Sequence, residues 1–102
     1  MDDLPDGVAI QPVFAIEAEY APDAGERRRL FRATHLADIA QARRNGVIVA
    51  AGGYADMSGS LILAHVPDEI AAQALVEADV YWRNGIWRSY RIRPLTIVVD
   101  AV

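Results

Sequence analysis

Residues 47–66 read VIVAAGGYADMSGSLILAHV, and they hold the most informative pattern in the chain. The run 47–51 is short and apolar, and the run 60–66 is mainly aliphatic, as buried strands are. Between them, residues 52–59 carry glycine at both ends, which is typical of a hairpin loop. We therefore predict two strands joined by a glycine-rich loop in the middle of the chain.

A predicted helix lies on either side of this hairpin. Residues 26–45 contain no proline or glycine, so we predict one long helix that ends at Gly46. Residues 69–79 form the second helix, with Asp68 as the expected N-cap, and 80–84 add one more turn. At 100° per residue, three apolar residues and one histidine share the core-facing stripe of the first helix. They are Phe31, His35, Ile39 and Ala42.

Two further strands are predicted toward the two ends of the chain. Residues 13–20 alternate between apolar and polar side chains. Residues 88–99 form the last strand, in which Pro94 indicates an edge, a bend or a bulge. Residues 1–12 hold three aspartates, two prolines and a glycine. We predict that they form a loose leader before a single domain over 13–102.

The resulting order, β-α-β-β-α-β, predicts the ferredoxin-like arrangement: an α+β fold whose four-stranded antiparallel sheet carries both helices on one face. Two copies that pack sheet to sheet would bury the other face, so we expect a homodimer. Glu17 and Glu19 are expected on that face near Arg91 and Arg93, as charge pairs across or around the interface. Plain solvated side chains are the alternative.

The composition excludes several classes of protein. The chain has 102 residues, 53% of them hydrophobic and 24% charged, which is typical of a folded domain. Its ten basic residues, all arginine, face fourteen acidic ones, and a net charge of −4 disfavours nucleic-acid binding. The lack of cysteine excludes disulfides, iron–sulfur clusters and thiol catalysis. No apolar run approaches the roughly 20 residues that a membrane span needs, and the N-terminus does not resemble a signal peptide. We therefore expect a cytoplasmic protein with no membrane partner.

Two histidines are the candidates for acid/base chemistry. His65 ends a predicted strand, and we read it as a surface residue. His35 interrupts an apolar stripe, so it is either a core histidine bonded to a carbonyl group or a general acid/base in a pocket. A catalytic histidine needs an orienting carboxylate, and the spacing leaves Asp38 and Asp79 both open. The chain lacks the histidine spacings of metal sites and any GxSxG elbow, so we predict no metal and no cofactor.

Seven short motifs, in order, support a more specific prediction. They are RATHL at 32–36, Gly46, AAGG at 50–53, GS at 59–60, AQALVEADVY at 72–81, NGIW at 84–87 and IRPL at 92–95. In their order and spacing the chain resembles the YCII-like family of dimeric α+β barrels, over residues 13–99.

This resemblance implies an active-site pair formed by His35 and Asp79, with Ser60 lining the same pocket. Two departures from the family pattern stand out. The family's Asp-Pro is here Asp79-Val80, which we expect to loosen the turn that aims Asp79. The family's Ala-Gly-Pro ends here in Gly53, which we expect to make the pocket loop more mobile.

Three functions fit these observations. The first is a small cofactor-free isomerase, lyase or dehydrochlorinase that uses the His–Asp pair on a small aromatic or lactone metabolite. The second is a non-catalytic small-molecule-binding or structural homodimer. The third is a haem- or oxygen-handling barrel, with His35 or His65 as the axial ligand of a haem. For the enzyme, the expected substrate-binding residues are Phe14, Phe31, Arg32, Ser60 and Tyr81.

Overall fold

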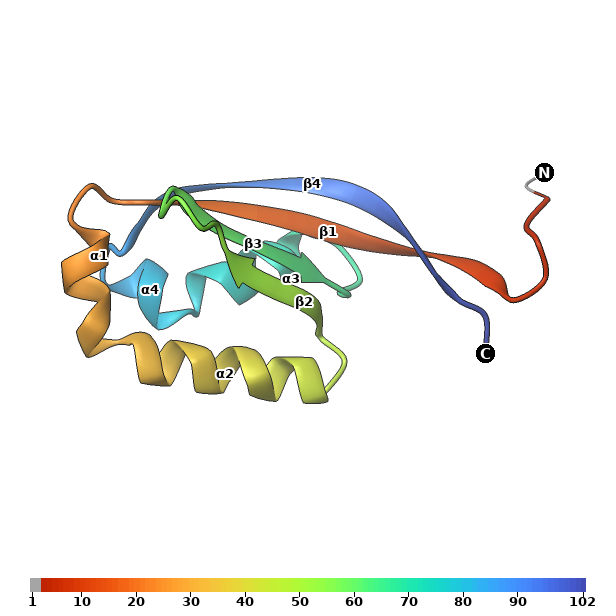
Figure 1. Cartoon of the computed structure of the whole chain (residues 1–102), viewed down its shortest axis with the longest axis horizontal. Coiled ribbons are helices and arrows are strands. Elements are labelled where there is room, and N and C mark those ends of the chain that lie inside the picture. The colour runs from red at the N-terminus through yellow and green to blue at the C-terminus, as the bar shows by residue number, and fades with distance from the viewer. Residues whose placement is uncertain (1–2) are drawn as a thin grey trace.

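The computed structural model describes residues 3–102 as a four-stranded antiparallel sheet in the order β2-β3-β1-β4, with the helices on one side (Figure 1). This arrangement confirms the predicted ferredoxin-like fold. None of the helices in this range is long and apolar enough to cross a membrane. The elements are β1 (Val8–Tyr20), α1 (Ala24–Arg27), η1 (Arg28–Leu30), α2 (Arg32–Arg44), β2 (Ile48–Gly53), β3 (Gly59–Ala64), α3 (Glu69–Glu77), α4 (Val80–Arg83) and β4 (Trp87–Asp100).

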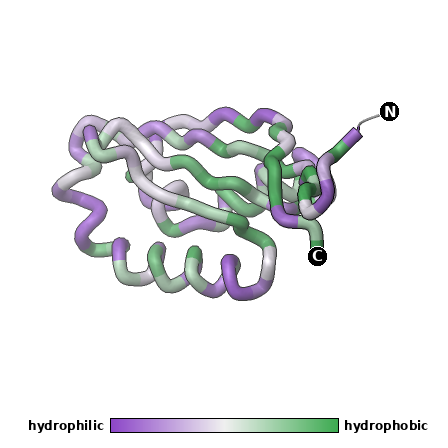
Figure 2. Tube along the Cα trace, turned by 45° about the vertical axis from the view of Figure 1, so that its right-hand side comes forward, coloured by the Kyte–Doolittle hydropathy of each residue, from purple (hydrophilic) through white to green (hydrophobic). Residues whose placement is uncertain are grey.

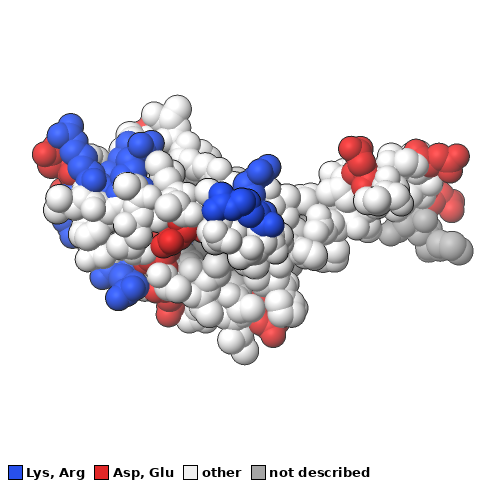
Figure 3. All heavy atoms as spheres, turned by 90° about the horizontal axis from the view of Figure 1, so that it is seen from below, with Lys and Arg blue, Asp and Glu red and all other residues white. Residues whose placement is uncertain are grey.

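The first strand begins well before residue 13. Residues 8–12 pair with 96–100 of β4, so the expectation of a loose leader is wrong for this segment. Pairing with the last strand gives its backbone groups partners that the local sequence does not reveal. Beyond the end of β3, residues 8–13 and 95–100 form a two-stranded arm that projects from the body (Figure 1 and Figure 3). Met1 and Asp2, which also belonged to the predicted leader, lie outside the described residues.

The predicted helix over 26–45 is not continuous, and the prediction is wrong for residues 28–31. The chain forms α1, then the 3-10 turn η1, and α2 begins only after Phe31, whose φ of −116° departs from helical geometry. This bend packs Phe31 against the core and turns Arg28 toward Tyr20. The last residues agree with the prediction, because α2 ends at Arg44 and Gly46 adopts a φ of +77°.

The hairpin loop is shorter than expected, because Gly52 and Gly53 belong to β2 and pair with β3. Gly59, which opens β3, meets a steric limit. A Cβ atom at this position would lie 2.1 Å from the carbonyl oxygen of Ala18 on the neighbouring strand. Only glycine therefore allows β1 and β3 to approach as they do here.

The core lies between the sheet and the helices. Ile16 of β1 and Ile62 of β3 are paired and buried, and the small Ala72 lets α3 approach the sheet closely. Figure 2 shows apolar residues along the strands, whereas α2 alternates between apolar and polar residues. Asp68 is the N-cap of α3, as predicted, and its carboxylate accepts the N–H of Ala71 at 2.8 Å.

Ion pairs cover part of the sheet face opposite the helices. Glu17 accepts hydrogen bonds from Arg91 at 3.1 Å and Arg93 at 2.9 Å, as the predicted pairing requires. Glu19 instead pairs with Arg88 at 2.7 Å, because a bulge in the β1–β4 pairing follows Glu19 and shifts the register. Both contacts are made within one chain, so they do not require a second copy.

The Glu17 pairs predict how stability responds to acid. The guanidinium groups of Arg91 and Arg93 hold the pKa of Glu17 below its ordinary value of 4.5. A lowered folded-state pKa stabilises the fold above pH 4.5, and this contribution is lost as the pH falls further. We expect Glu17→Gln to lose less stability than the wild type between pH 5 and 3, by a small margin because the side chains are exposed. Urea unfolding at several pH values measures this loss, with Glu26→Gln at an exposed position of α1 as the control. An equal loss of stability in Glu17→Gln and the wild type would contradict the prediction.

Candidate active site

His35 and Asp79 meet in the interior. The Nδ1 atom of His35 lies 2.9 and 3.0 Å from the two carboxylate oxygens of Asp79, and their side chains are only 11% and 7% exposed. Asp38, the local alternative, is exposed, at the rim of a hollow that Asp79 also lines. The tertiary structure thus selects the distant carboxylate that the motifs indicated.

The backbone around α4 aims the Asp79 carboxylate. Asp79 is the N-cap of α4, and its Oδ1 accepts the N–H of Tyr81 at 2.8 Å while also contacting His35. A capping aspartate is fixed by the helix that it caps. Val80 therefore does not prevent the turn from aiming Asp79 at His35, contrary to the expectation from its departure from proline.

This turn predicts a stabilising substitution, Val80→Pro. Position 80 is the first residue of α4, where the N–H has no acceptor within the helix and proline is favoured. Asp79 has a φ of −70° and a ψ of 138°, a conformation suited to a residue before proline. We expect a gain of about 0.4–1 kcal/mol, mainly because the unfolded chain loses freedom.

Thermal unfolding checks this prediction, with an expected rise in Tm of roughly 2–8 °C for a domain of this size. Val80→Ala is the matched control, because it shortens the same partly buried side chain but keeps the N–H. A lower Tm for Val80→Pro than for Val80→Ala would show that the ring does not fit the turn.

Aromatic rings fix the plane of the imidazole. His35 stacks on Tyr81, with ring centroids 3.8 Å apart and planes inclined by 5°, and Trp87 packs edge-on against both rings at 5.5 Å. Tyr81 and Trp87 are each 1% exposed. Burial raises the pKa of Tyr81, so its hydroxyl group is neutral at physiological pH.

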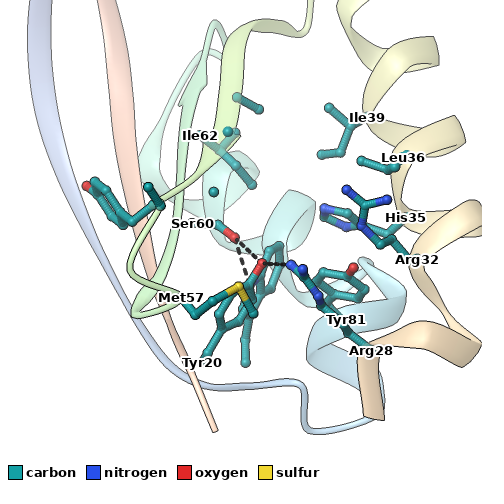
Figure 4. A pocket seen from close by; sticks show the side chains of 16 residues that line it. Tyr20, Arg28, Arg32, His35, Leu36, Ile39, Met57, Ser60, Ile62 and Tyr81 are labelled. Atoms are coloured by element: carbon teal, nitrogen blue, oxygen red, sulfur yellow. Dashed lines mark hydrogen bonds between the residues drawn. The ribbon is translucent and has the colours of Figure 1, made fainter. Parts of the chain in front are cut away.

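A cavity of about 300 Å³ opens beside His35 (Figure 4). Arg32, Ser60 and Tyr81, three of the predicted substrate-binding residues, line it together with His35. Asp79 is absent from this lining among residues 3–102, and bonds to His35 from a separate hollow between α2 and α3. Nε2 is the ring nitrogen that this contact leaves for a ligand.

Phe14 and Phe31 are not brought to the cavity, although we expected them there. Tyr20, at the end of β1, lines the cavity. Phe14 lies six positions earlier on the same extended strand, which places it about 20 Å from Tyr20. Phe31 packs against the core where the chain bends into α2. His65, the second histidine, is exposed just beyond the end of β3.

Sequence reasoning missed several residues that line the cavity, among them Tyr20 and Arg28. Trp87 donates its indole N–H to Ser60 at 3.2 Å, and Ser60 donates to the phenol oxygen of Tyr20 at 3.3 Å. Arg28 donates to the same oxygen at 3.4 Å. Tyr20 carried only one signal, its place on the apolar side of β1, and Arg28 carried none within its predicted helix.

Comparison with known proteins agrees with this fold. The model of the YCII-related domain family matches residues 13–96. The chain belongs to this family. Among its relatives, Protein YciI of Escherichia coli and Protein YciI of Shigella flexneri are each 28% identical to it over 92 residues, covering 80% of this chain and 94% of the relative.

A solved structure resembles this YCII-related domain as well. It is the 5-chloro-2-hydroxyhydroquinone dehydrochlorinase of Burkholderia phenoliruptrix in complex with 2,5-dihydroxybenzoquinone. The TM-score is 0.68 at 21% identity, over 79% of this chain and 90% of the other. This likeness shows the shared fold. Residues 8–12 and 97–100, most of the arm, lie outside the part of the chain that the family model matches.

Proposed function

We propose that this chain is a small enzyme that moves protons to and from a bound metabolite through His35. The observation that carries the proposal is the contact of Asp79 with Nδ1 of a nearly buried imidazole whose ring lines a cavity. Nε2 then accepts a proton from the substrate, and the Asp79 carboxylate stabilises the imidazolium until the proton is returned. Such proton transfer needs no bound cofactor.

The cavity supports a small substrate. Its volume of about 300 Å³ lies at the lower end of the range for ligand pockets, which suits a single aromatic ring or a lactone. The dehydrochlorinase that shares the fold is named for a chlorinated hydroxyhydroquinone. We therefore propose isomerisation, lyase or dehydrochlorinase chemistry on a ring compound of that size, since each can begin with a proton transfer at carbon or oxygen.

A turnover screen with matched histidine variants tests the enzyme. Chlorinated hydroquinones are assayed for released chloride, and small lactones and hydroxyquinones are assayed for isomerisation by their absorbance. We expect one of these compounds to be turned over by the wild type and by His65→Gln, but not by His35→Gln. Turnover that survives in His35→Gln would overturn the proposal. Binding without turnover across the screen would favour the non-catalytic small-molecule-binding alternative.

We further propose that two copies pack through the sheet face opposite the helices. Leu61 and Leu63 lie on this face, where they pair with Glu17 and Ala15, and both leucines are only partly buried in one chain. Covering them would remove apolar surface from water. Sedimentation at micromolar concentration tests the dimer, with Leu63→Arg expected to yield monomers. A monomeric wild type would contradict the dimer.

We also propose a cytoplasmic location, which cell fractionation tests.

A further inference from the structure

The hydrogen bonds below the cavity have a fixed direction. An indole N–H can only donate, so the Ser60 oxygen accepts from Trp87 and its own proton goes to Tyr20. The Tyr20 oxygen also accepts from Arg28. With both of these donors directed at its oxygen, the phenol proton of Tyr20 is left to be donated, and Tyr20 lines the cavity (Figure 4).

Arginine side chains add further donors at the same place. Figure 4 shows Arg28 reaching Tyr20, and Arg32 beside the ring of His35. Arg32 is the first residue of α2, whose first turn holds no acidic residue. Within residues 3–102, neither arginine makes an ion pair, and no aspartate or glutamate lines the cavity. This end of the cavity therefore presents positive charge and hydrogen-bond donors to whatever enters.

Apolar side chains form another part of the cavity wall. Leu36 and Ile39 of α2 face Ile62 of β3 across it, and the Tyr81 ring lies beside His35 (Figure 4). A ligand that satisfies both parts has a flat apolar body and ionised oxygen atoms at one end. Guanidinium groups bind such oxygens strongly, through charge-assisted hydrogen bonds.

We propose that the cavity selects a small planar organic anion, whose ionised oxygens are bound by Tyr20, Arg28 and Arg32 while its ring lies against the apolar wall. This inference rests on the proposed function in using the same cavity, and it names the substrate class: ring carboxylates, enolates or phenolates. Tyr20 and Arg28 become ligand-binding residues, and Ser60 a positioning residue that acts through Tyr20.

Benzoate and benzamide are the probes, because they share a shape and differ in charge. Their binding is followed by NMR shifts of the backbone amides of Gly53, Ser60 and Arg32. We expect benzoate to bind at least about tenfold more tightly than benzamide. Arg28→Gln, Arg32→Gln and Tyr20→Phe are each expected to weaken benzoate binding about five- to twentyfold, and to leave benzamide binding nearly unchanged.

Arg43→Gln is the matched control, because Arg43 is exposed near the far end of the same helix as Arg32. It should bind benzoate as the wild type does. Equal affinity for the two probes, no binding of either at millimolar concentration, or unchanged benzoate affinity in the three variants would each overturn the anion site.

Probe binding and turnover, measured on the wild type, separate this inference from the proposed enzyme. If the wild type prefers benzoate but turns over no compound, the anion site stands and the enzyme fails. If it turns over neutral compounds and binds both probes equally, the enzyme stands and the anion site fails.

Discussion

Asp79→Asn will lower kcat/KM about 10²- to 10⁴-fold on the substrate of the proposed enzyme, the range over which positioned acid/base groups contribute. The amide has almost the same shape and its oxygen can still accept the N–H of Tyr81, so α4 keeps its cap. It carries no negative charge to stabilise the imidazolium, and it does not enforce the tautomer that leaves Nε2 as the base. Loss of turnover with an intact fold is the expected result.

Asp38→Asn is the matched control for this substitution. Asp38 lies three residues from His35 on the same helix, but it is exposed. We expect it to retain the turnover of the wild type. Equal kcat/KM for Asp79→Asn and Asp38→Asn would show that the buried contact serves stability alone.

The effect of Asp79→Asn on His35 can also be measured without a substrate. The Asp79 carboxylate can accept a hydrogen bond from the N–H at Nδ1, so long-range 1H–15N NMR should show His35 with Nδ1 protonated in the wild type and a mixture of tautomers in Asp79→Asn. The exposed His65 should give the same spectrum in both proteins and serves as the internal reference. An unchanged His35 spectrum would mean that another group sets its tautomer.

Gly59→Ala will destabilise the fold by about 1–3 kcal/mol, the usual result of forcing an extra methyl group into packed structure. The added carbon would lie 2.1 Å from the carbonyl oxygen of Ala18, and a backbone oxygen cannot rotate away as a side chain can. β1 and β3 must therefore separate next to Ser60 and Tyr20, so we also expect weaker binding of benzoate in the cavity.

Gly52→Ala provides the comparison for this prediction. Gly52 belongs to the neighbouring strand β2, and a Cβ atom built there has no atom within 4 Å. Urea unfolding should give Gly52→Ala nearly the stability of the wild type and Gly59→Ala a much lower midpoint. Equal midpoints for the two variants would show that β1 and β3 accommodate the added methyl group without a loss of stability.

The fold could be predicted from local pattern because each main element has its own periodicity. Alternation indicated the strands, and the stripe that contains His35 indicated the core side of α2. The errors arose where distant partners decide the conformation. The arm forms because residues 8–12 find β4, Gly52 and Gly53 stay extended because they pair with β3, and the chain bends at Phe31 so that its side chain reaches the core.

The site was predictable only in part, for the same reason. His35 could be singled out because it interrupts an apolar stripe, but spacing alone could not choose between Asp38 and Asp79. That choice depends on where α4 begins relative to α2, which the motifs of the family indicated and the fold shows. Tyr20 and Arg28 lie on either side of α1 in the sequence, and no local pattern marks either as a cavity residue.

The pairing of β1 with β4 also constrains when this protein can complete its fold during synthesis. β1 is synthesised before the other three strands and occupies an inner position of the sheet, yet its longest partner is β4, the last of the four to be synthesised. Until β4 is available, the nascent chain exposes an unpaired inner edge, a surface prone to aggregation. Trp87 opens β4, so the ring that packs against His35 also arrives only with this strand. The sheet and the candidate active site are therefore completed together, by the same last strand.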